Sequence, residues 1–125
     1  MKRTKYGSKK VKKDGIWFDS IYEMKRYCVL KLLEKSGAIS DLRLQVPYLV
    51  SPAIYFNSDI KSFTFEKQSG KHGFCVQREK HYIADFVYRE KGVEVVEDAK
   101  GFRTDEYKKK ANQMRKLYGI IIKET

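Results

Sequence analysis

The sequence of 125 residues is poor in several features that define other classes of protein. It has two prolines, two isolated cysteines (Cys28 and Cys75) and two histidines. These cysteines and histidines are too few and too scattered to form a zinc site or a disulfide framework. The lack of a disulfide framework favours a reducing, intracellular setting. No apolar run approaches the roughly 20 residues that span a bilayer, and no apolar stretch follows the basic N-terminus as in a signal peptide.

Acidic residues are also scarce, and this shortage predicts the kind of partner. The chain has 16 Asp and Glu against 27 Lys and Arg, a net charge of +11. Such a charge favours a polyanion, and nucleic acid is preferred to a membrane because the charge is spread along the chain. A hydrophobic content of 42% indicates a folded protein rather than a basic tail. We expect a flexible basic arm over residues 1–14 and a single domain over residues 15–125.

Two helices are expected near the ends of the chain. The first begins at Asp19-Ser20, runs to about Lys35 and stops at Gly37; the second begins at Thr104, runs to about Tyr118 and stops at Gly119. The core-facing stripe of the first is predicted to comprise Ile21, Met24, Cys28 and Leu32, widened by Tyr27 and Val29. The stripe of the second is predicted to comprise Tyr107, Ala111, Met114 and Tyr118.

The remaining segments favour strands. Residues 39–56 alternate loosely, and Pro47 and Pro52 restrict them to an edge or bent strand. Residues 57–80 suggest an inserted hairpin with a turn at residues 70–73. Residues 120–122 suggest a short buried strand, reached by a parallel crossover through the second helix.

Two strands in the middle of this order carry acids where apolar side chains are usual. Residues 82–88 and 93–101 are rich in β-branched and aromatic residues, and the link between them contains Gly92, so an antiparallel hairpin is expected. A carboxylate buried without a partner is costly, so Asp85 and Asp98 need a reason to be there. The structural alternative is a surface hairpin whose acids pair with lysines.

The register of the hairpin brings the acids together. A four-residue loop makes Asp98 the diagonal neighbour of Asp85, and a two-residue loop sets them directly opposite each other. Either loop places Lys100 on the same face and Glu97 on the other. Two carboxylates that hold Mg²⁺ or Mn²⁺, with a lysine to orient water or stabilise charge, are the minimum for metal-assisted phosphodiester hydrolysis.

Other residues are weaker candidates for the site. Glu23 stands three residues after Ser20, so it either completes a capping box or adds a carboxylate to the metal site. Gln45 either reaches the site or is an ordinary surface residue, and His72 and His81 favour surface or phosphate-contacting roles over catalysis. DNA backbone contacts are expected from basic residues of the N-terminal segment and of the second helix, namely Lys9, Lys10, Lys12, Lys13, Lys108, Lys109 and Arg115.

At its acids the chain resembles the PD-(D/E)XK nuclease superfamily. Asp85 fits the lone acid and Asp98-Ala99-Lys100 the acid-x-lysine element, although Ala84 replaces the proline. Further likeness to small bacteriophage nucleases related to endonuclease-I-type Holliday junction resolvases rests on Lys5-Tyr6-Gly7, Asp14-Gly15, Phe18-Asp19-Ser20, Ile83-Ala84-Asp85-Phe86, Glu97-Asp98-Ala99-Lys100-Gly101 and Glu106-Tyr107.

The resemblance implies an α/β fold with a restriction-endonuclease-like αβββαβ core, a mixed central sheet flanked by helices and an inserted β-hairpin. It also implies a Mg²⁺- or Mn²⁺-dependent endonuclease acting on branched DNA in the cytoplasm of a bacterial host, encoded by a phage or prophage, with Asp85, Asp98, Lys100 and Glu23 at its centre. The alternatives are a nicking or double-strand endonuclease of repair or restriction type, and a basic nucleic-acid-binding module without chemistry.

A resolvase makes two symmetric cuts, which require two sites and therefore a homodimer. The candidate dimer surfaces are the first helix, with Tyr22, Tyr27 and Leu30, and the segment that contains Phe63 and Phe65. The alternative is that these side chains complete the core of a monomer.

Overall fold

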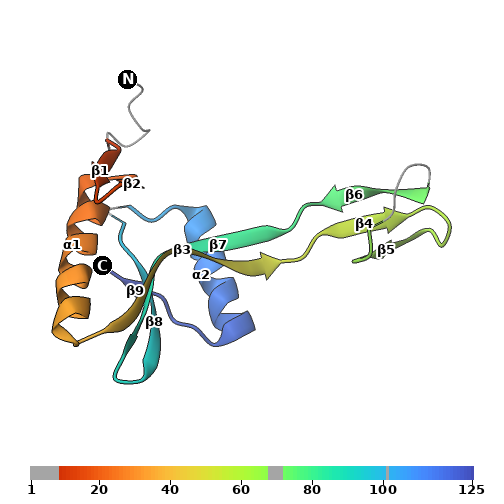
Figure 1. The fold of residues 1–125 in the computed structure, drawn as a ribbon. Helices are drawn as coiled ribbons and strands as arrows, with labels where there is room; N and C mark the ends of the chain where they lie inside the picture. Colours follow the sequence, from red (N-terminus) through yellow and green to blue (C-terminus); the bar gives the residue numbers. More distant parts are fainter. Residues whose placement is uncertain (1–8, 68–71, 101) are drawn as a thin grey trace.

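The computed structural model describes residues 9–67, 72–100 and 102–125. It is a mixed α/β structure in which a four-stranded sheet, in the order β3-β7-β8-β9, lies between two helices (Figure 1). The sheet is formed by β3 (Ser40–Ser51), β7 (Lys80–Glu90), β8 (Val93–Asp98) and β9 (Lys123–Glu124). Strands β3, β7 and β8 are antiparallel neighbours, and β9 runs parallel to β8.

The two helices begin and end where the sequence predicts. Helix α1 (Ile21–Ser36) has Ser20 as its N-cap and Gly37, in the left-handed region, as its C-cap. Helix α2 (Asp105–Tyr118) has Thr104 and Gly119 in the same roles. In both, the cap hydroxyl accepts a backbone N–H from the third residue along, so one donor of the first turn is satisfied.

The buried face of α1 differs from the prediction. Its buried residues are Glu23, Tyr27 and Leu30, whereas Ile21 is 48% and Leu32 is 69% exposed. The predicted stripe follows the apolar residues of the helix alone. The inward face shares Tyr27 and the partly buried Met24 and Cys28 with the prediction, but it adds Leu30, which packs with Phe86 and Tyr88 of the sheet, and the carboxylate of Glu23. Tyr27 and Leu30 are therefore core residues, so their assignment to a dimer surface is wrong.

Helix α2 follows its predicted stripe more closely. Tyr107 and Met114 are buried and pack with β7 and β8, with Ala111 partly buried beside them. The last member, Tyr118, is 47% exposed and its hydroxyl donates to the carbonyl of Leu49 at 2.6 Å. The helices thus cover opposite faces of the sheet.

The β7–β8 hairpin has the two-residue loop. Lys91 and Gly92 both have positive φ, 52° and 76°, as a type I′ turn requires. The register pairs Glu90 with Val93 and Phe86 with Glu97. One further step in that register sets Asp85 opposite Asp98.

The long strands β3 and β7 change faces at one point. Gln45, which stands opposite Asp85 in the β3–β7 register, has a left-handed φ of 54°. On one side of this point the even-numbered residues pack toward α1, namely Leu42, Leu44, Phe86 and Tyr88. On the other side they pack toward α2, namely Val46, Tyr48, Val50, Tyr82 and Ala84. The strict alternation of a regular strand is therefore interrupted next to Asp85.

The inserted segment is a three-stranded sheet and not a simple hairpin. Strands β4 (Ile54–Asn57), β5 (Ser62–Thr64) and β6 (Gly73–Gln77) lie in the order β5-β4-β6, so β5 and β6 both pair with β4. Residues 70 and 71 of the predicted turn lie outside the described residues. The segment formed by residues 54–67 and 72–77, which we call the arm, extends away from both helices as a continuation of β3 and β7 (Figure 1).

The two ends of the chain also differ from expectation. The parallel crossover is present, but its strand is β9 at Lys123–Glu124, and Ile121 is 81% exposed, so residues 120–122 are not a buried strand. Near the N-terminus, β1 (Val11–Lys13) pairs with β2 (Ile16–Phe18), so the last residues of the basic segment expected to be flexible, residues 1–14, form part of a hairpin. Residues 1–8 lie outside the described residues. Among the described helices, none has the length and apolar character to cross a membrane.

Candidate active site at the end of strand β8

Asp98 is the last residue of β8 and is 1% exposed. Its Oδ2 accepts a hydrogen bond of 2.6 Å from the hydroxyl of Tyr82. Its Oδ1 forms an ion pair with Lys100 Nζ at 3.4 Å but has no hydrogen-bond partner among the described residues. A buried carboxylate oxygen without a hydrogen bond is costly, so this atom is available to a cation.

Asp85, on β7, is the second buried acid of the site. It is 7% exposed, and its Oδ2 accepts the backbone N–H of Ala99 at 3.0 Å. Burial, and then the negative charges of Asp98 and Glu23, raise the pKa of Asp85 to about 7, against the opposing effect of Lys100. The sequence prediction that Asp85, Asp98 and Lys100 share one place is therefore met by the fold.

The third acid near Asp85 and Asp98 is Glu23, on α1. Its backbone N–H is bonded to the Ser20 hydroxyl, which is the serine half of a capping box, while its Oε1 accepts from Gln45 Nε2 at 3.1 Å. The side chain is buried, and burial followed by the charge of Asp19 raises the pKa of Glu23. The charges of Lys100 and Asp98 also act on it. At the cap the contact is made by the backbone of Glu23, whereas its carboxylate accepts from Gln45 and lies near enough to Lys100 and Asp98 to feel their charges.

The donor set fits a hard divalent cation, with one restriction. Across the described ranges, no three or more His, Cys, Asp and Glu side chains are grouped so that they could hold a metal ion. Mg²⁺, however, commonly takes one or two carboxylates and completes its shell with water and substrate phosphate. Two buried carboxylates, Asp85 and Asp98, are present for that mode, and Oδ1 of Asp98 accepts no hydrogen bond from the described residues.

A cavity of about 260 Å³ adjoins the site and includes Lys100, Tyr82, Tyr107 and His81 in its lining. Lys100 Nζ lies 5.8 Å from the centroid of the Tyr107 ring, in cation–π range. The lysine is thus held between Asp98 and an aromatic face. A bound phosphate oxygen in this cavity would meet the cationic lysine beside the carboxylates.

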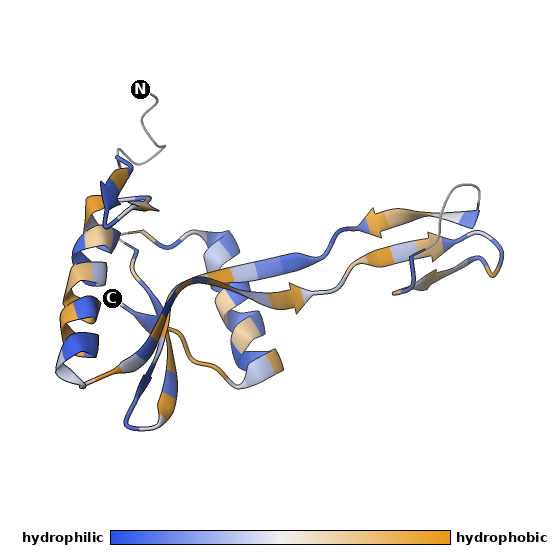
Figure 2. Cartoon of the chain, in the orientation of Figure 1, coloured by the Kyte–Doolittle hydropathy of each residue, from blue (hydrophilic) through white to orange (hydrophobic). Residues whose placement is uncertain are grey.

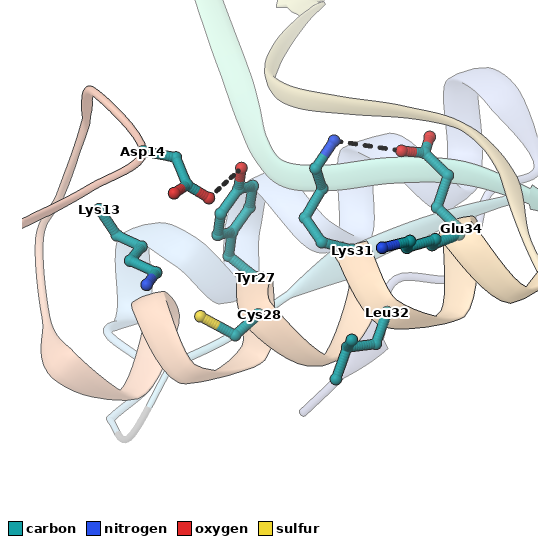
Figure 3. A pocket seen from close by; sticks show the side chains of 8 residues that line it. Lys13, Asp14, Tyr27, Cys28, Lys31, Leu32 and Glu34 are labelled. Carbon is teal, nitrogen blue, oxygen red and sulfur yellow. Dashed lines mark hydrogen bonds and ion pairs between the residues drawn. The ribbon is translucent and has the colours of Figure 1, made fainter.

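The larger cavity of about 520 Å³ lies elsewhere, between the β1–β2 turn and α1 (Figure 3). There Tyr27 donates to Asp14, Lys31 pairs with Glu34, and Cys28 and Leu32 line the outer part. Its lining includes none of the four predicted catalytic residues. We place the site at the smaller cavity because its lining includes Lys100, the ion-pair partner of Asp98, and Tyr82, which donates a hydrogen bond to Asp98.

The face opposite Asp98 carries an acid of a different kind. Glu97 is fully buried, and its carboxylate accepts from Arg26 Nε at 2.6 Å, Arg26 Nη2 at 2.8 Å and the Tyr88 hydroxyl at 2.7 Å. Burial raises the pKa of Glu97, but the hydrogen bonds from Arg26 and Tyr88 outweigh this and hold it below its ordinary value. A fully bonded acid of this kind supports the end of β8, so its role is structural.

Three residues that contact the buried acids were not predicted from the sequence, or only in part. Arg26 and Tyr82 belong to no motif. A contact between Gln45 and the site was one of two alternatives, the other being an ordinary surface glutamine. Regular alternation puts Tyr82 on the face away from Asp85, and only the change of faces at Gln45 turns it toward Asp98.

The predicted DNA-contacting residues are exposed on two separate elements. Lys9, Lys10, Lys12 and Lys13 precede or lie on β1, and Lys108, Lys109 and Arg115 lie on α2. Lys12 Nζ is 5.7 Å from the Trp17 ring centroid, and Arg115 donates to Asn112 at 2.8 Å. They contribute to the positive surface but do not touch the buried acids in the contacts described.

Fold and site together define a mixed α/β protein with an acid-and-lysine centre at the end of a sheet strand. The chain belongs to the DUF1064 family, described as a protein of unknown function, whose family model matches residues 3–123. No curated protein and no solved structure matches the sequence.

Proposed function

We propose that this protein is a metal-dependent DNA endonuclease that hydrolyses phosphodiester bonds. The observation that carries the proposal is the buried pair Asp85 and Asp98, set on neighbouring strands with Lys100 Nζ 3.4 Å from Asp98. Like charges buried together are unfavourable unless a cation joins them. A net charge of +11 supports a polyanionic substrate.

The order of elements also supports the proposal. Without the N-terminal hairpin and the arm, the chain runs α1, β3, β7, β8, α2, β9. This is the αβββαβ order of a restriction-endonuclease-like core, and the acids stand on its second and third strands. Because fold alone does not define function, the buried acids and Lys100 carry the proposal.

Each residue has a definite task in the proposed reaction. Asp85 and Asp98 would hold Mg²⁺ or Mn²⁺, which, when bound, neutralises the scissile phosphate and lowers the pKa of the attacking water. Lys100, kept in place by Asp98 and the Tyr107 ring, would orient the water or stabilise negative charge on phosphate oxygens. Glu23, whose pKa is raised by burial, would accept a proton from water or bind the ion through water.

The proposed substrate is branched DNA, and the proposed enzyme is a homodimer. The support for both is the resemblance to endonuclease-I-type resolvases, together with the need of a symmetric double cut for two sites.

The test is nicking of supercoiled plasmid with Mn²⁺ or Mg²⁺ by wild-type protein and Asp98→Asn. The substitution keeps the shape and removes the charge, so cleavage should fall about a hundredfold or more while DNA binding stays within about twofold. Glu94→Gln is the matched control, because Glu94 is an exposed acid of the same strand that pairs with Arg43. Chelator should abolish cleavage by wild-type and control alike.

Wild-type activity in Asp98→Asn would exclude this site. Binding to DNA without any cleavage, unchanged by metal, would instead support the basic nucleic-acid-binding module. A comparison of four-way junction, fork, nicked and linear duplex then tests the branched substrate.

A further inference from the structure

We propose that the aromatic face of the arm binds unpaired bases of the DNA strand that leads to the active site. The inference rests on the proposed function, since it names the form of DNA that this site receives. It begins from a row of exposed phenylalanines that the fold leaves uncovered.

Three rings lie side by side across the three strands of the arm. Phe56 on β4 is paired directly with Phe63 on β5 and with Phe74 on β6. The ring centroids are 5.7 Å apart for Phe56 and Phe63, and 5.5 Å apart for Phe56 and Phe74. Directly paired residues point to the same face, so the rings form one row. The opposite face, with Tyr55 paired to Thr64 and Cys75, is more polar.

This row is open to solvent. Phe63 is 65% and Phe74 is 60% exposed, and Phe65, just after β5, is 72% exposed. Among the described residues, neither of the two core clusters includes a side chain of the arm. Figure 2 shows hydrophobic residues in the strands of the arm, which extends away from both helices. A contiguous apolar patch of this kind indicates a binding surface.

The size of the row argues against a second copy of the chain as its occupant. A stable protein interface takes roughly 20–30 residues a side, whereas three or four phenyl rings offer only a small part of that. A stacked base needs only one exposed ring, and every base has a face that can stack.

The charges around the row are mixed. Exposed cations lie at both ends of the arm, with Lys61 just before β5, Arg78 just after β6 and Lys80 at the start of β7. Three acids, Asp59, Glu66 and Glu79, are also present, and Asp59 is paired with His72 at 3.1 Å. The attraction therefore comes from the chain as a whole, and the rings supply the preference for unpaired bases.

The arm is continuous with the catalytic strand. Strand β7 starts at the base of the arm and carries Asp85. At this base, Gln77 at the end of β6 donates a hydrogen bond of 2.8 Å to the hydroxyl of Ser51 at the end of β3. An extended chain from Phe74 to Asp85 spans at most about 40 Å. A single strand of about 12 nucleotides, at 3.4 Å per step, covers that distance.

The experiment measures binding by fluorescence anisotropy in the full chain, with chelator present so that no DNA is cut. The probes are a single-stranded oligonucleotide of about 20 nucleotides and a blunt duplex of equal length. Phe63→Leu/Phe74→Leu retains apolar bulk and removes the stacking rings, and Thr64→Ala/Cys75→Ala alters the opposite face of the same strands. The Leu variant should lose at least about tenfold in single-strand affinity, and duplex affinity should change less than about twofold.

Equal losses on both probes, or no loss on the single strand, would overturn the inference. If the Leu variant is destabilised, Phe65→Leu, which lies outside the strands, gives the same test. A loss of dimer mass in sedimentation without a change in DNA affinity would assign the row to a second copy instead. If the protein binds single strands selectively through the row but does not nick plasmid, the proposed function is rejected and the role of the row in binding unpaired bases stands. If it nicks plasmid but does not bind single strands selectively, the proposed function stands and the role of the row is rejected.

Discussion

Tyr82 shows how a residue outside the acid-and-lysine motif supports the proposed site. It is 3% exposed, and its hydroxyl donates to Asp98 Oδ2 at 2.6 Å. Burial and this hydrogen bond raise the pKa of Tyr82, so it stays a donor throughout the neutral range. The phenol fixes one oxygen of Asp98, which leaves Oδ1 beside Lys100 for a cation. Tyr82 is in this sense a positioning residue.

Tyr82→Phe is therefore expected to weaken metal binding more than folding. The concentration of Mn²⁺ that gives half-maximal nicking should rise about tenfold, as is usual when the partner of a metal ligand is lost. Tyr118→Phe is the matched control, because it removes a hydroxyl that donates to a backbone carbonyl at 2.6 Å on the surface. An equal rise in the control, or none in Tyr82→Phe, would contradict this role.

At the residue scale the sequence predicted the acids better than their partners. Asp85, Asp98 and Lys100 follow from the period of two in a hairpin, whichever even loop is used. Tyr82 and Gln45 depend on the left-handed backbone at Gln45, where both strands change faces. No local signal marks glutamine for that conformation, because it is imposed by packing against two helices.

At the scale of elements, the Arg26–Glu97 pair joins α1 to β8. Both guanidinium bonds are shorter than 3 Å, and Tyr88 supplies a third donor to the carboxylate. The pKa of Glu97 lies below its ordinary value of 4.5, so the folded state favours the charged form. This contribution to stability is present above the unfolded pKa, and it is lost as pH falls through the lower folded pKa.

Glu97→Gln should lower the free energy of unfolding by roughly 2–4 kcal/mol at pH 7, because Arg26 is left without its counterion. The difference from wild type should begin to shrink as pH falls below about 4.5, where Glu97 of the unfolded chain takes up a proton, and it should be lost once pH has fallen through the lower folded pKa. Urea unfolding at pH 7 and pH 3 measures both. Glu94→Gln, which breaks the exposed pair with Arg43, should cost less than about 1 kcal/mol. A difference that does not depend on pH would contradict the assignment.

Elements with strong local signals were predicted closely, and those fixed by distant contacts were not. The caps at Ser20, Gly37, Thr104 and Gly119 depend on residues close in sequence, and both helices begin and end at them as predicted. The face that α1 buries is decided by the sheet, which takes Tyr27 and Leu30 and leaves Leu32 exposed. The arm was expected as a hairpin because the pairing of β4 with both β5 and β6 joins segments that are distant in sequence.

At the scale of the whole molecule, a symmetric double cut requires two copies of the site. Since Tyr27 and Leu30 belong to the core, the part of α1 that could still contribute to a dimer is its exposed face. It presents Tyr22, Val29 and Leu32, exposed by 51%, 45% and 69%. Their spacing puts them on one side of the helix, away from the sheet.

We therefore expect sedimentation at micromolar concentration to give twice the chain mass of 14.8 kDa. Leu32→Glu should reduce this to one chain mass, because two charges would face each other across a two-fold axis. The variant should still nick plasmid but lose paired cuts within one binding event on a four-way junction, since each site is complete in one chain. Phe63→Glu is the control, and it should leave the mass unchanged. A strict monomer on and off DNA that nicks linear duplex as readily as a junction would reject the resolvase while leaving the site at Asp85 and Asp98 in place.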